Sequence, residues 1–507
     1  MSRITGNDAK VESSSEDSVI STQLSDNLQR ITKTFDRCSD FLILPWQYGP
    51  ELKYSAFSVY SEALIQKKEY NYFKESLQDL VSHEVGPGMT ITPEDVNFFF
   101  TNHGASAHCA VIIDDFHEAI DKILHGFIVI FVDKWNKAIG YDALALETRQ
   151  VTESITEPVV YGPRESTVEN MKKNIGMLRK RLKTSNFKIE TFETTAQTKT
   201  KIAYGYLDGT TNPDMLAEFQ RRISNIKNTE ILETSYIEEL IEDSPYSPFP
   251  QYRYTERTDV AIASLLDGKI IVMVEGTGSI LICPGLLVEL LQSSEDYYQR
   301  TVVASLIRFI RMIALFIAIS LPSIYIAFST FHPELIPTVL LLAVVNSREG
   351  IPFPAVVEAF IMEFFFELLR EAGIRLPRPV GSAVSIVGAL VIGEAAINAG
   401  IASPIMVIIV ALTGIASFAM PQYNFGISLR ILRFPLMILA GFLGIFGIMI
   451  AFLLIWLHLV NLRSLGQPYL SPLGPFRPQQ LKDVFVRAPL GILTRSSRNS
   501  QIRKPSK

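Results

Sequence analysis

Four carboxylates lie in a segment that is otherwise apolar and aromatic, VVEAFIMEFFFELLREAG (residues 356–373). They belong to Glu358, Glu363, Glu367 and Glu371. A step of four residues turns an α-helix by about 400°, so the last three acids stay on one face. Glu358 lies about 140° away from Glu363 on the same helix. The segment therefore predicts a helix with an acidic stripe.

The free energy of placing charges in lipid limits where this stripe can lie. A charge at the bilayer centre costs roughly 2.5–3.5 kcal/mol, whereas an apolar residue returns about 0.3–0.6 kcal/mol. We expect the stripe to line water, to pair with arginine, or to lie along a membrane surface. Lining water would give an ion-conducting or ion-coupling surface, because carboxylate rings attract cations. The other two cases describe a solvated or salt-bridged helix, with Arg348, Arg370 and Arg375 near in sequence.

A second candidate is Glu394, which stands alone in SIVGALVIGEAAINAG (residues 385–400). An isolated acid in such a segment is a functional candidate by default, and a packed polar residue is the alternative. His332 and Glu334 end the first apolar run, where we favour a wet boundary over a gate. Small residues four apart let helices approach closely within a bundle or between protomers. These pairs are Ala389/Gly393, Ala395/Ala399 and Ala440/Gly444.

The elements that carry these residues are long apolar segments. Residues 312–331 and 436–457 hold no charged residue, and each can cross a hydrocarbon core of about 30 Å at about 1.5 Å per residue. Arginines are expected in cytoplasmic loops, among them Arg430 and Arg433. The further candidate spans are 352–369, 380–399, 401–420 and 434–460, with a short stretch at 336–345.

The number of crossings is the open point of this topology. A cytoplasmic start and a cytoplasmic tail need an even number, but simple counting gives five full spans and the short stretch. Either the stretch 336–345 crosses together with 352–369, or one segment is interfacial or re-entrant. Prolines in HPELIP, SREGIPFP and RLPRPVG are typical of broken helices.

The two ends of the chain indicate the same compartment. The polar, acidic start has no signal peptide and predicts disorder over about 25 residues. The tail after Phe476 has a formal charge of +7, which favours the cytoplasmic side and contact with anionic lipid. It has almost no aromatics to stack on bases, which argues against nucleic acid. Three scattered cysteines give neither a disulfide framework nor a metal site.

The soluble part contains a candidate repeat. AIDKILHGFIVIFV (119–132) and AIASLLDGKIIVMV (261–274) match at an offset of 142 residues. Each predicts a helix that ends at a glycine, Gly126 or Gly268, followed by a buried strand. We favour two related α/β subdomains over chance similarity. The expected domains are a disordered tail 1–29, α/β subdomains 30–150 and 151–300, a polytopic transmembrane helical domain 301–475, and a cytoplasmic tail 476–507.

The second copy contains a proline-rich segment, EELIEDSPYSPFPQYRYTERTD (238–259), after a strand at 204–207 and a helix from Asn212-Pro213 to Ile223. It is either an ordered loop that contacts a partner or the membrane region, or an ordinary connection. The candidates for coupling are Tyr252, Arg253, Glu256 and Arg257. The chain has no phosphate-binding glycine loop, HExxH, CxxC or GxSxG motif, which argues against common NTPases, zincins and hydrolases.

Several long motifs resemble one known family, the spore germination receptor A-subunit (GerA) family. The resemblance covers about residues 97–476. It is carried by VYGPRESTVENMKKNIGMLRKRL (160–182), PYSPFPQYRYTERTD (245–259), LLQSSEDYYQR (290–300), residues 332–404 and SLGQPYLSPLGPF (464–476).

The resemblance implies a location in the inner membrane of bacterial endospores, with the N-terminal domain and the tail on the core side. The A subunit is thought to act with a transporter-like B subunit and a lipoprotein C subunit in sensing nutrients, which bind mainly to B. It is thought to oligomerise into a channel that releases monovalent cations, without a cofactor or metal. On this interpretation Glu358, Glu363, Glu367 and Glu394 are the candidates for pore or gating residues.

Three alternatives stay open beside this non-enzymatic receptor subunit. A relative within the family amplifies germination without sensing nutrients. A secondary transporter can also have broken helices and midplane acids, but would be expected to show a repeat in its membrane half. A membrane enzyme using Glu363, Glu367 and His332 has no metal or nucleophile constellation to support it.

Overall fold

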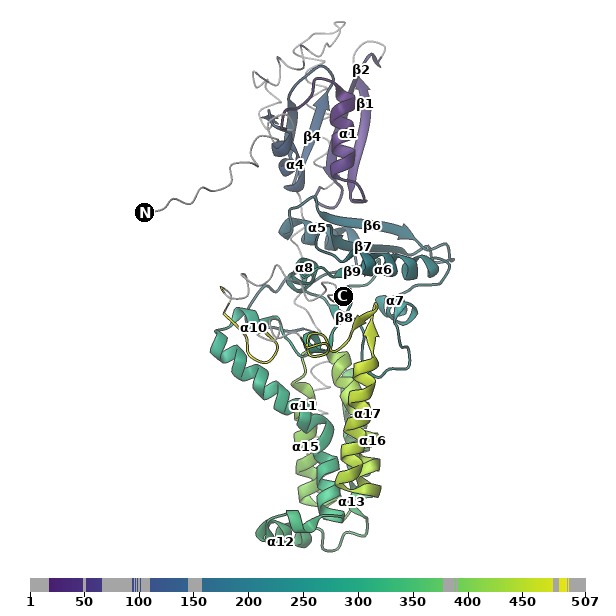
Figure 1. Cartoon of the computed structure of the whole chain (residues 1–507), viewed down its shortest axis with the longest axis vertical. Helices are drawn as coiled ribbons and strands as arrows, with labels where there is room; N and C mark the ends of the chain where they lie inside the picture. Colours follow the sequence, from purple (N-terminus) through teal and green to yellow (C-terminus); the bar gives the residue numbers. More distant parts are fainter. Residues whose placement is uncertain are drawn as a thin grey trace, which may run out of the picture.

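The computed structural model is elongated, with two β-sheet layers stacked above a helical bundle (Figure 1). The described residues are 18–48, 52–65, 110–144, 157–376, 391–476 and 483–489, together with residues 94, 96, 98, 101, 388 and 491. The predicted fold class, an α/β region followed by an α-helical region, is confirmed.

The first sheet is antiparallel, with strand order β1-β2-β4-β5-β3. Helix α1 (Leu24–Thr34) and helix α4 (Phe116–Leu124) cover one face. They bury Ile31 and Ile123 against Phe57 and Phe131 of the sheet. The strands are β1 (Phe41–Tyr48), β2 (Tyr54–Ser61), β3 (Ala110–Ile113), β4 (Phe127–Val132) and β5 (Ala138–Asp142).

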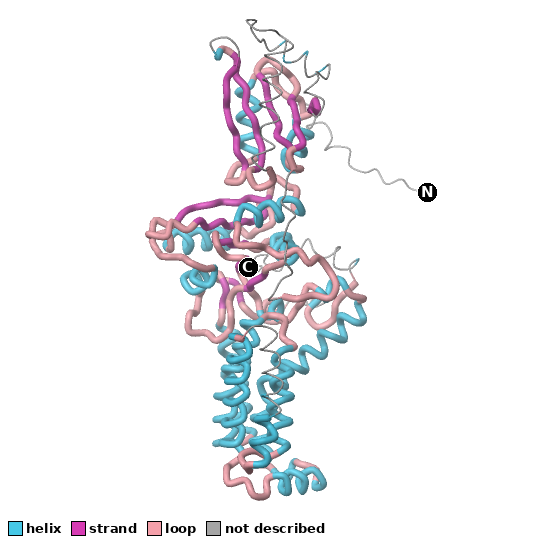
Figure 2. Tube along the Cα trace, turned by 180° about the vertical axis from the view of Figure 1, so that it is seen from behind, coloured by secondary structure: helices cyan, strands magenta, loops and turns pink. Residues whose placement is uncertain are grey.

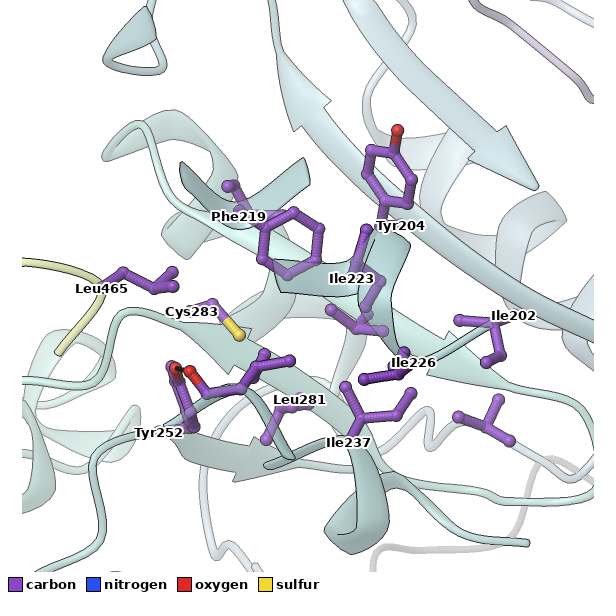
Figure 3. Packing of buried hydrophobic residues seen from close by; sticks show 14 of the residues in the cluster. Ile202, Tyr204, Phe219, Ile223, Ile226, Ile237, Tyr252, Leu281, Cys283 and Leu465 are labelled. Carbon is purple, nitrogen blue, oxygen red and sulfur yellow. Dashed lines mark hydrogen bonds between the residues drawn. The ribbon is translucent and has the colours of Figure 1, made fainter. Parts of the chain in front are cut away.

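The second sheet is also antiparallel, with strand order β6-β7-β9-β10-β8, and helices cover both of its faces. Figure 3 shows the core on the side of α6 and α7, where Phe219, Tyr252 and Cys283 pack together. The strands are β6 (Phe187–Glu193), β7 (Lys201–Leu207), β8 (Arg253–Thr255), β9 (Ile270–Val274) and β10 (Ile280–Cys283). The helices are α5 (Met171–Arg181), α6 (Pro213–Asn225), α7 (Thr234–Ile241) and α8 (Thr258–Leu266).

The two sheets have the same topology, which supports their interpretation as related copies. Numbered within each copy, the strand order is 1-2-4-5-3 in both. The predicted helix–glycine–strand units are confirmed as α4–β4 and α8–β9, and Gly126 and Gly268 have φ angles of 89° and 82°. Only glycine adopts this conformation readily. The predicted helix after Asn212 is confirmed as α6, with Asn212 as its N-cap.

The first sheet joins the second at an edge strand. Residues Arg37 to Ser39 run beside β6, with Cys38 bridging Ile189 in a parallel arrangement and Ser39 N donating to Ile189 O at 2.8 Å. A buried ion pair lies beside this join, where Arg179 Nε is 2.8 Å from Asp40 Oδ2. The edge of the second sheet is therefore covered by the segment that connects α1 to β1 of the first sheet.

The helical region starts after two short helices, α9 (Leu287–Leu290) and α10 (Glu295–Tyr298). Among the described residues, α11 and α16 are long and apolar enough to cross a membrane. Residues 391–398 are also helical. The main helices are α11 (Thr301–Thr330), α12 (Thr338–Ser347), α13 (Ala355–Arg375), α15 (Pro404–Phe418), α16 (Tyr423–Leu443) and α17 (Ile445–Asn461).

The prediction of a single last span over 434–460 is wrong. Gly444 stands between α16 and α17 with a φ angle of 62°, a conformation that ends a helix. The chain turns back there, and the two helices pack side by side in both views (Figures 1 and 2). Arg430 and Arg433, which we expected in a loop, lie inside α16.

This turn also bears on the number of crossings. Helix α12 lies across the lower end of the bundle and does not run along it (Figure 1). The bundle begins at the sheet-facing end with α11 and returns there with α17, whose His458 contacts Ser247. The bundle therefore starts and ends at the sheet-facing end, and the reversal at Gly444 adds a pass that a single span over 434–460 would lack.

Candidate functional site: the charges of the bundle and its joint with the second sheet

Glu358, the first of the predicted carboxylates, is fully buried in the first turn of α13. Its Oε1 accepts hydrogen bonds from the backbone N and the Oγ of Ser403, at 2.6 and 2.5 Å. Its Oε2 lies 3.7 Å from Arg348 Nε. Ser403 is the N-cap of α15, so Glu358 fastens the start of that helix to α13.

Glu363 points into the bundle and pairs with an arginine of another helix. Arg433 of α16 donates to Glu363 Oε2 at 2.5 Å and to the carbonyl of Ala318 in α11 at 2.8 Å. Both side chains are 3% exposed. One Glu363 oxygen and one Arg433 nitrogen have no hydrogen-bond partner among the described residues. The pair therefore ties α13, α16 and α11 together.

The remaining acids of the stripe are also paired. Half-exposed Glu367 contacts Arg370 in its own helix and lies 3.3 Å from Arg430 of α16. Glu371 pairs with Arg375 in an exposed contact. Of the three open alternatives, the structure supports pairing with arginine for the whole stripe.

Glu394 differs from these acids because its side chain lies on the exposed surface of the bundle. The exposed positions of its helical segment are Val391, Glu394, Ala395 and Asn398, and Ala399 in the turn that follows is also exposed. Their spacing of three and four residues places them on one face. The face combines polar side chains with small ones. Gly393 is buried instead, and a Cβ there would lie 3.3 Å from Val407.

The other helix-packing candidates occupy different positions. Ala440 is fully buried within α16, whereas Gly444 forms the turn after it. Close approach at this turn depends on Gly447, since a Cβ there would lie 2.0 Å from Leu439 O. Ala389 lies outside the described residues. His332 Nδ1 lies 3.4 Å from Glu334 Oε1, just after the end of α11.

The proline-rich segment is an ordered loop that docks on the bundle. Pro248 O accepts a hydrogen bond from Ser428 of α16, and Pro250 O accepts one from Tyr469 at 2.9 Å. Ser247 Oγ lies 2.8 Å from His458 Nε2 of α17. Phe249 is buried between the aromatic rings there. The loop thus holds the second sheet on the tops of α16 and α17.

The four predicted coupling residues follow this loop in sequence, and they differ in whether they connect to the bundle. Tyr252 is buried in the core of the second sheet, and its hydroxyl donates to Ile241 O at 2.9 Å. Arg253 lies 3.8 Å from Glu157, which accepts from Gln422 at the start of α16 at 2.7 Å. Arg253 therefore reaches the bundle through Glu157.

The other two candidates lie within the second sheet region. The backbone carbonyl of Glu256 accepts from Thr167 N at 2.7 Å. Arg257 is buried, and it binds Asp259 of α8 with two nitrogens at 3.1 and 2.8 Å. These contacts position the start of α8.

A second link between the two regions escaped the sequence analysis. After α17, a small hairpin pairs β11 (Arg463–Ser464) with β12 (Gln467–Pro468). Leu465 at its turn is 2% exposed and packs in the core of the second sheet with Tyr252 and Cys283 (Figure 3). The only signal was the Leu-Gly step of the SLGQPY motif, which is compatible with a turn.

A polar pocket of about 470 Å³ lies away from the bundle, between β6, β7 and α6. Glu190 accepts from the hydroxyls of Tyr204 and Tyr206 at 2.6 and 3.0 Å. Burial raises the pKa of Tyr206 to about 12. Arg37 and Lys227 line the same pocket. In the described part of the chain, the pocket included, no three His, Cys, Asp or Glu side chains are grouped to hold a metal ion.

Comparisons with known proteins agree with the motifs. A family model described as "Bacillus/Clostridium GerA spore germination protein" matches residues 29–499. "Uncharacterized membrane protein YfkQ" of Bacillus subtilis is 42% identical over 95% of this chain and 92% of that protein. "Spore germination protein KA" of Bacillus subtilis is 40% identical over 93% of this chain and 85% of that protein.

Among solved structures, the chain is similar to the N-terminal domain of the A subunit of the Bacillus megaterium spore germinant receptor GerK3. The match has 25% identity and a TM-score of 0.41, and covers 53% of this chain and 97% of that domain. The family model spans most of the chain, and the two relatives exceed the identity at which homology is secure. The chain therefore belongs to the GerA family of spore germination proteins.

Proposed function

We propose that this chain is the A subunit of a spore germinant receptor and forms a cation channel as an oligomer in the inner membrane of the spore. The proposed partners are germinant receptor B and C subunits, further copies of this chain, and monovalent cations as permeant ions. The sheets and the tail are on the core side in this proposal. Family membership supports the role in germination.

The exposed face around Glu394 carries the channel proposal. A charge that faces lipid costs up to about 2.5–3.5 kcal/mol at the bilayer centre. Glu394, one turn before the end of its helical segment, has no compensating arginine among the described residues. Asn398 adds a second polar group one turn later on the same face. A face of this kind is stable where several copies surround water, because its small residues let protomers approach closely.

The acids of α13 take a different role in this proposal. Glu358 and Glu363 are buried within one protomer and hold helices together. We therefore assign gating or structural roles to them, and permeation to Glu394. The docked loop and the Leu465 hairpin supply two mechanical connections between the second sheet and the bundle.

The experiment is the release of monovalent cations from spores that carry Glu394→Gln or the pair Glu363→Gln and Glu367→Gln. Receptor levels are measured in each strain, and nutrient-independent germination serves as the control. We expect Glu394→Gln to lose or alter release at normal receptor levels. We expect the double variant to lower receptor levels. Unchanged release in Glu394→Gln spores would refute the assignment of permeation to this residue.

Germination amplification without nutrient sensing remains the alternative within the family. In both proposals the chain conducts ions, but a nutrient triggers the receptor and another germination protein triggers the amplifier. The two functions are distinguished by the nutrient response of spores in which this chain is the sole A-type subunit. A nutrient response by this chain with its B and C partners supports the receptor, and no response supports the amplifier.

A further inference from the structure

The first third of α11 presents an apolar face that nothing in the described chain covers. This part of the helix runs obliquely from α10 toward the bundle (Figure 1). The exposed fractions on this face range from 44% for Ile313 to 81% for Val302. Its residues are Val302, Val303, Leu306, Phe309, Ile310 and Ile313. The spacing of one, three and four residues places them on one side of the helix.

The opposite face is fixed to the rest of the chain. Arg308 and Arg311 are buried and share the carboxylate of Asp296, with nitrogen–oxygen distances of 3.0 and 3.1 Å. Ala304 and Ala314 are buried on the same side. The orientation of the exposed face is therefore set by contacts with α10.

The length of α11 indicates where this face lies. Thirty residues at about 1.5 Å per residue give about 45 Å, which exceeds a hydrocarbon core of about 30 Å. About ten residues at the start of α11 therefore extend into the headgroup layer. These are the residues that leave the bundle obliquely.

The residue types of the exposed face distinguish lipid from a second copy of the chain. Interfaces between membrane helices are rich in small residues. Here the small residues, Ala304 and Ala314, face the protein, and the exposed face holds only Val, Leu, Ile and Phe. An amphipathic helix with this division lies in the membrane interface with its apolar side toward the acyl chains.

The C-terminal tail supplies the charge. Asp483 Oδ1 lies 3.0 Å from Arg308 Nη1, and Arg487 donates to Thr301 Oγ1 at 3.0 Å. Asp483 and Arg487 are thereby held beside the start of α11. The sequence that follows Gly491 has no acid and five basic residues, namely Arg495, Arg498, Arg503, Lys504 and Lys507. Clusters of this kind next to a membrane helix bind anionic lipid.

We propose that residues 302–313 of α11 form a docking surface for an anionic lipid leaflet, and that the basic sequence after Gly491 contributes positive charge to this binding. The apolar face enters the boundary between headgroups and acyl chains, and the tail binds the phosphates. This surface would fix the height and tilt of the second sheet above the membrane. The proposal rests on the membrane location proposed above.

The test uses the full chain in phospholipid vesicles with a single fluorescent label. Phe309→Cys is labelled with an environment-sensitive dye in a Cys109→Ser background, since Cys38 and Cys283 are buried. Lipids with a nitroxide near the headgroup serve as quenchers. Leu453→Cys in α17 reports insertion of the bundle, and Tyr246→Cys, fully exposed in the docked loop, reports water.

We expect at least a two-fold quenching at position 309 and little at 246, while deep nitroxides quench the label at 453. No quenching at 309 with quenching at 453 overturns the inference and leaves the membrane location intact. Disulfide cross-linking between copies of the Phe309→Cys variant without lipid quenching also overturns it, because a second copy then covers the face. No quenching at 453 refutes the membrane location itself.

A comparison of two lipid compositions tests whether the basic residues after Gly491 contribute to binding of anionic lipid. Vesicles with phosphatidylglycerol are compared with vesicles of phosphatidylcholine alone. We expect stronger quenching at 309 in the anionic vesicles, and loss of this difference when the five basic residues after Gly491 are changed to Gln. An unchanged difference would overturn the part assigned to the tail.

Discussion

The sheets and the helical bundle place apolar and charged side chains in opposite ways. In the sheets, apolar residues such as Phe219 and Val272 form closed cores. In the bundle, Phe442, Phe446 and Leu453 lie on the outer surface with exposed fractions of 59–76%, while charged groups lie inside. Water favours the first arrangement and lipid the second. The contrast supports the proposed location of the bundle in lipid and of the sheets in water.

The largest expected effect comes from breaking a charge pair inside the bundle. Arg433→Ala leaves the Glu363 carboxylate buried and unpaired, which costs about 3–5 kcal/mol. We expect a large loss of folded protein, measured by the thermal unfolding of the chain in detergent. The matched control, Arg375→Ala, breaks an exposed pair with Glu371 and should cost less than about 1 kcal/mol. Equal effects of the two variants would contradict the contrast.

The second prediction concerns the joint between the two regions. Leu465→Ala removes a buried side chain from the core of the second sheet and should cost about 2–4 kcal/mol. Because Leu465 follows α17, we also expect slower germination at the same receptor level. Leu473→Ala in the chain beyond the hairpin serves as the comparison. Normal germination of Leu465→Ala spores would show that the hairpin transmits nothing.

A variant of the docked loop tests the coupling of the second sheet to the bundle with a smaller effect on the stability of the fold. Tyr252 is a core residue, so a variant there would confound the two. Ser428→Ala with Tyr469→Phe removes two hydrogen bonds to the docked loop, each contributing about 0.5–1.5 kcal/mol. We predict impaired germination with near-normal receptor levels in spores. Normal germination at a normal receptor level would show that these loop contacts do not couple the second sheet to the bundle.

The smallest effect is a pH dependence at the same joint. Burial and the nearby acids Glu238, Glu239 and Asp243 raise the pKa of Glu242 to about 7. Since its pKa in the unfolded chain is about 4.3, the folded state binds the proton more tightly. Stability from this group is therefore full at low pH and falls as pH rises from about 4.3 to 7. Thermal unfolding should show a weaker fall in Glu242→Gln, and an identical profile would contradict this assignment.

Local patterns predicted the sheets well and the bundle less well. The glycine caps at Gly126 and Gly268 and the N-cap at Asn212 act within a few residues, so the sequence specifies them directly. The turn at Gly444 lies inside a continuous apolar run, so the hydropathy pattern does not show that the chain reverses direction there. A glycine at the centre of an unusually long run was the available signal.

The partners of the acids were predicted only where they were near in sequence. Arg370 and Arg375 lie within a helical turn of their carboxylates, and periodicity finds them. Arg433 is 70 residues from Glu363, so the pairing depends on how α13 and α16 pack. An arginine inside an apolar run could have indicated a buried partner, because such a charge needs one.

In the proposed channel, the face that carries Glu394 and Asn398 lines an aqueous path. The most direct measurement is the reaction of single cysteines with a membrane-impermeant thiol reagent in vesicles or spores. We predict that Glu394→Cys and Asn398→Cys react, and that Ala396→Cys, which is buried within the protomer, does not. Absence of reaction at 394 and 398, with quenching of labels there by lipid nitroxides, would show that this face contacts lipid and lines no aqueous path.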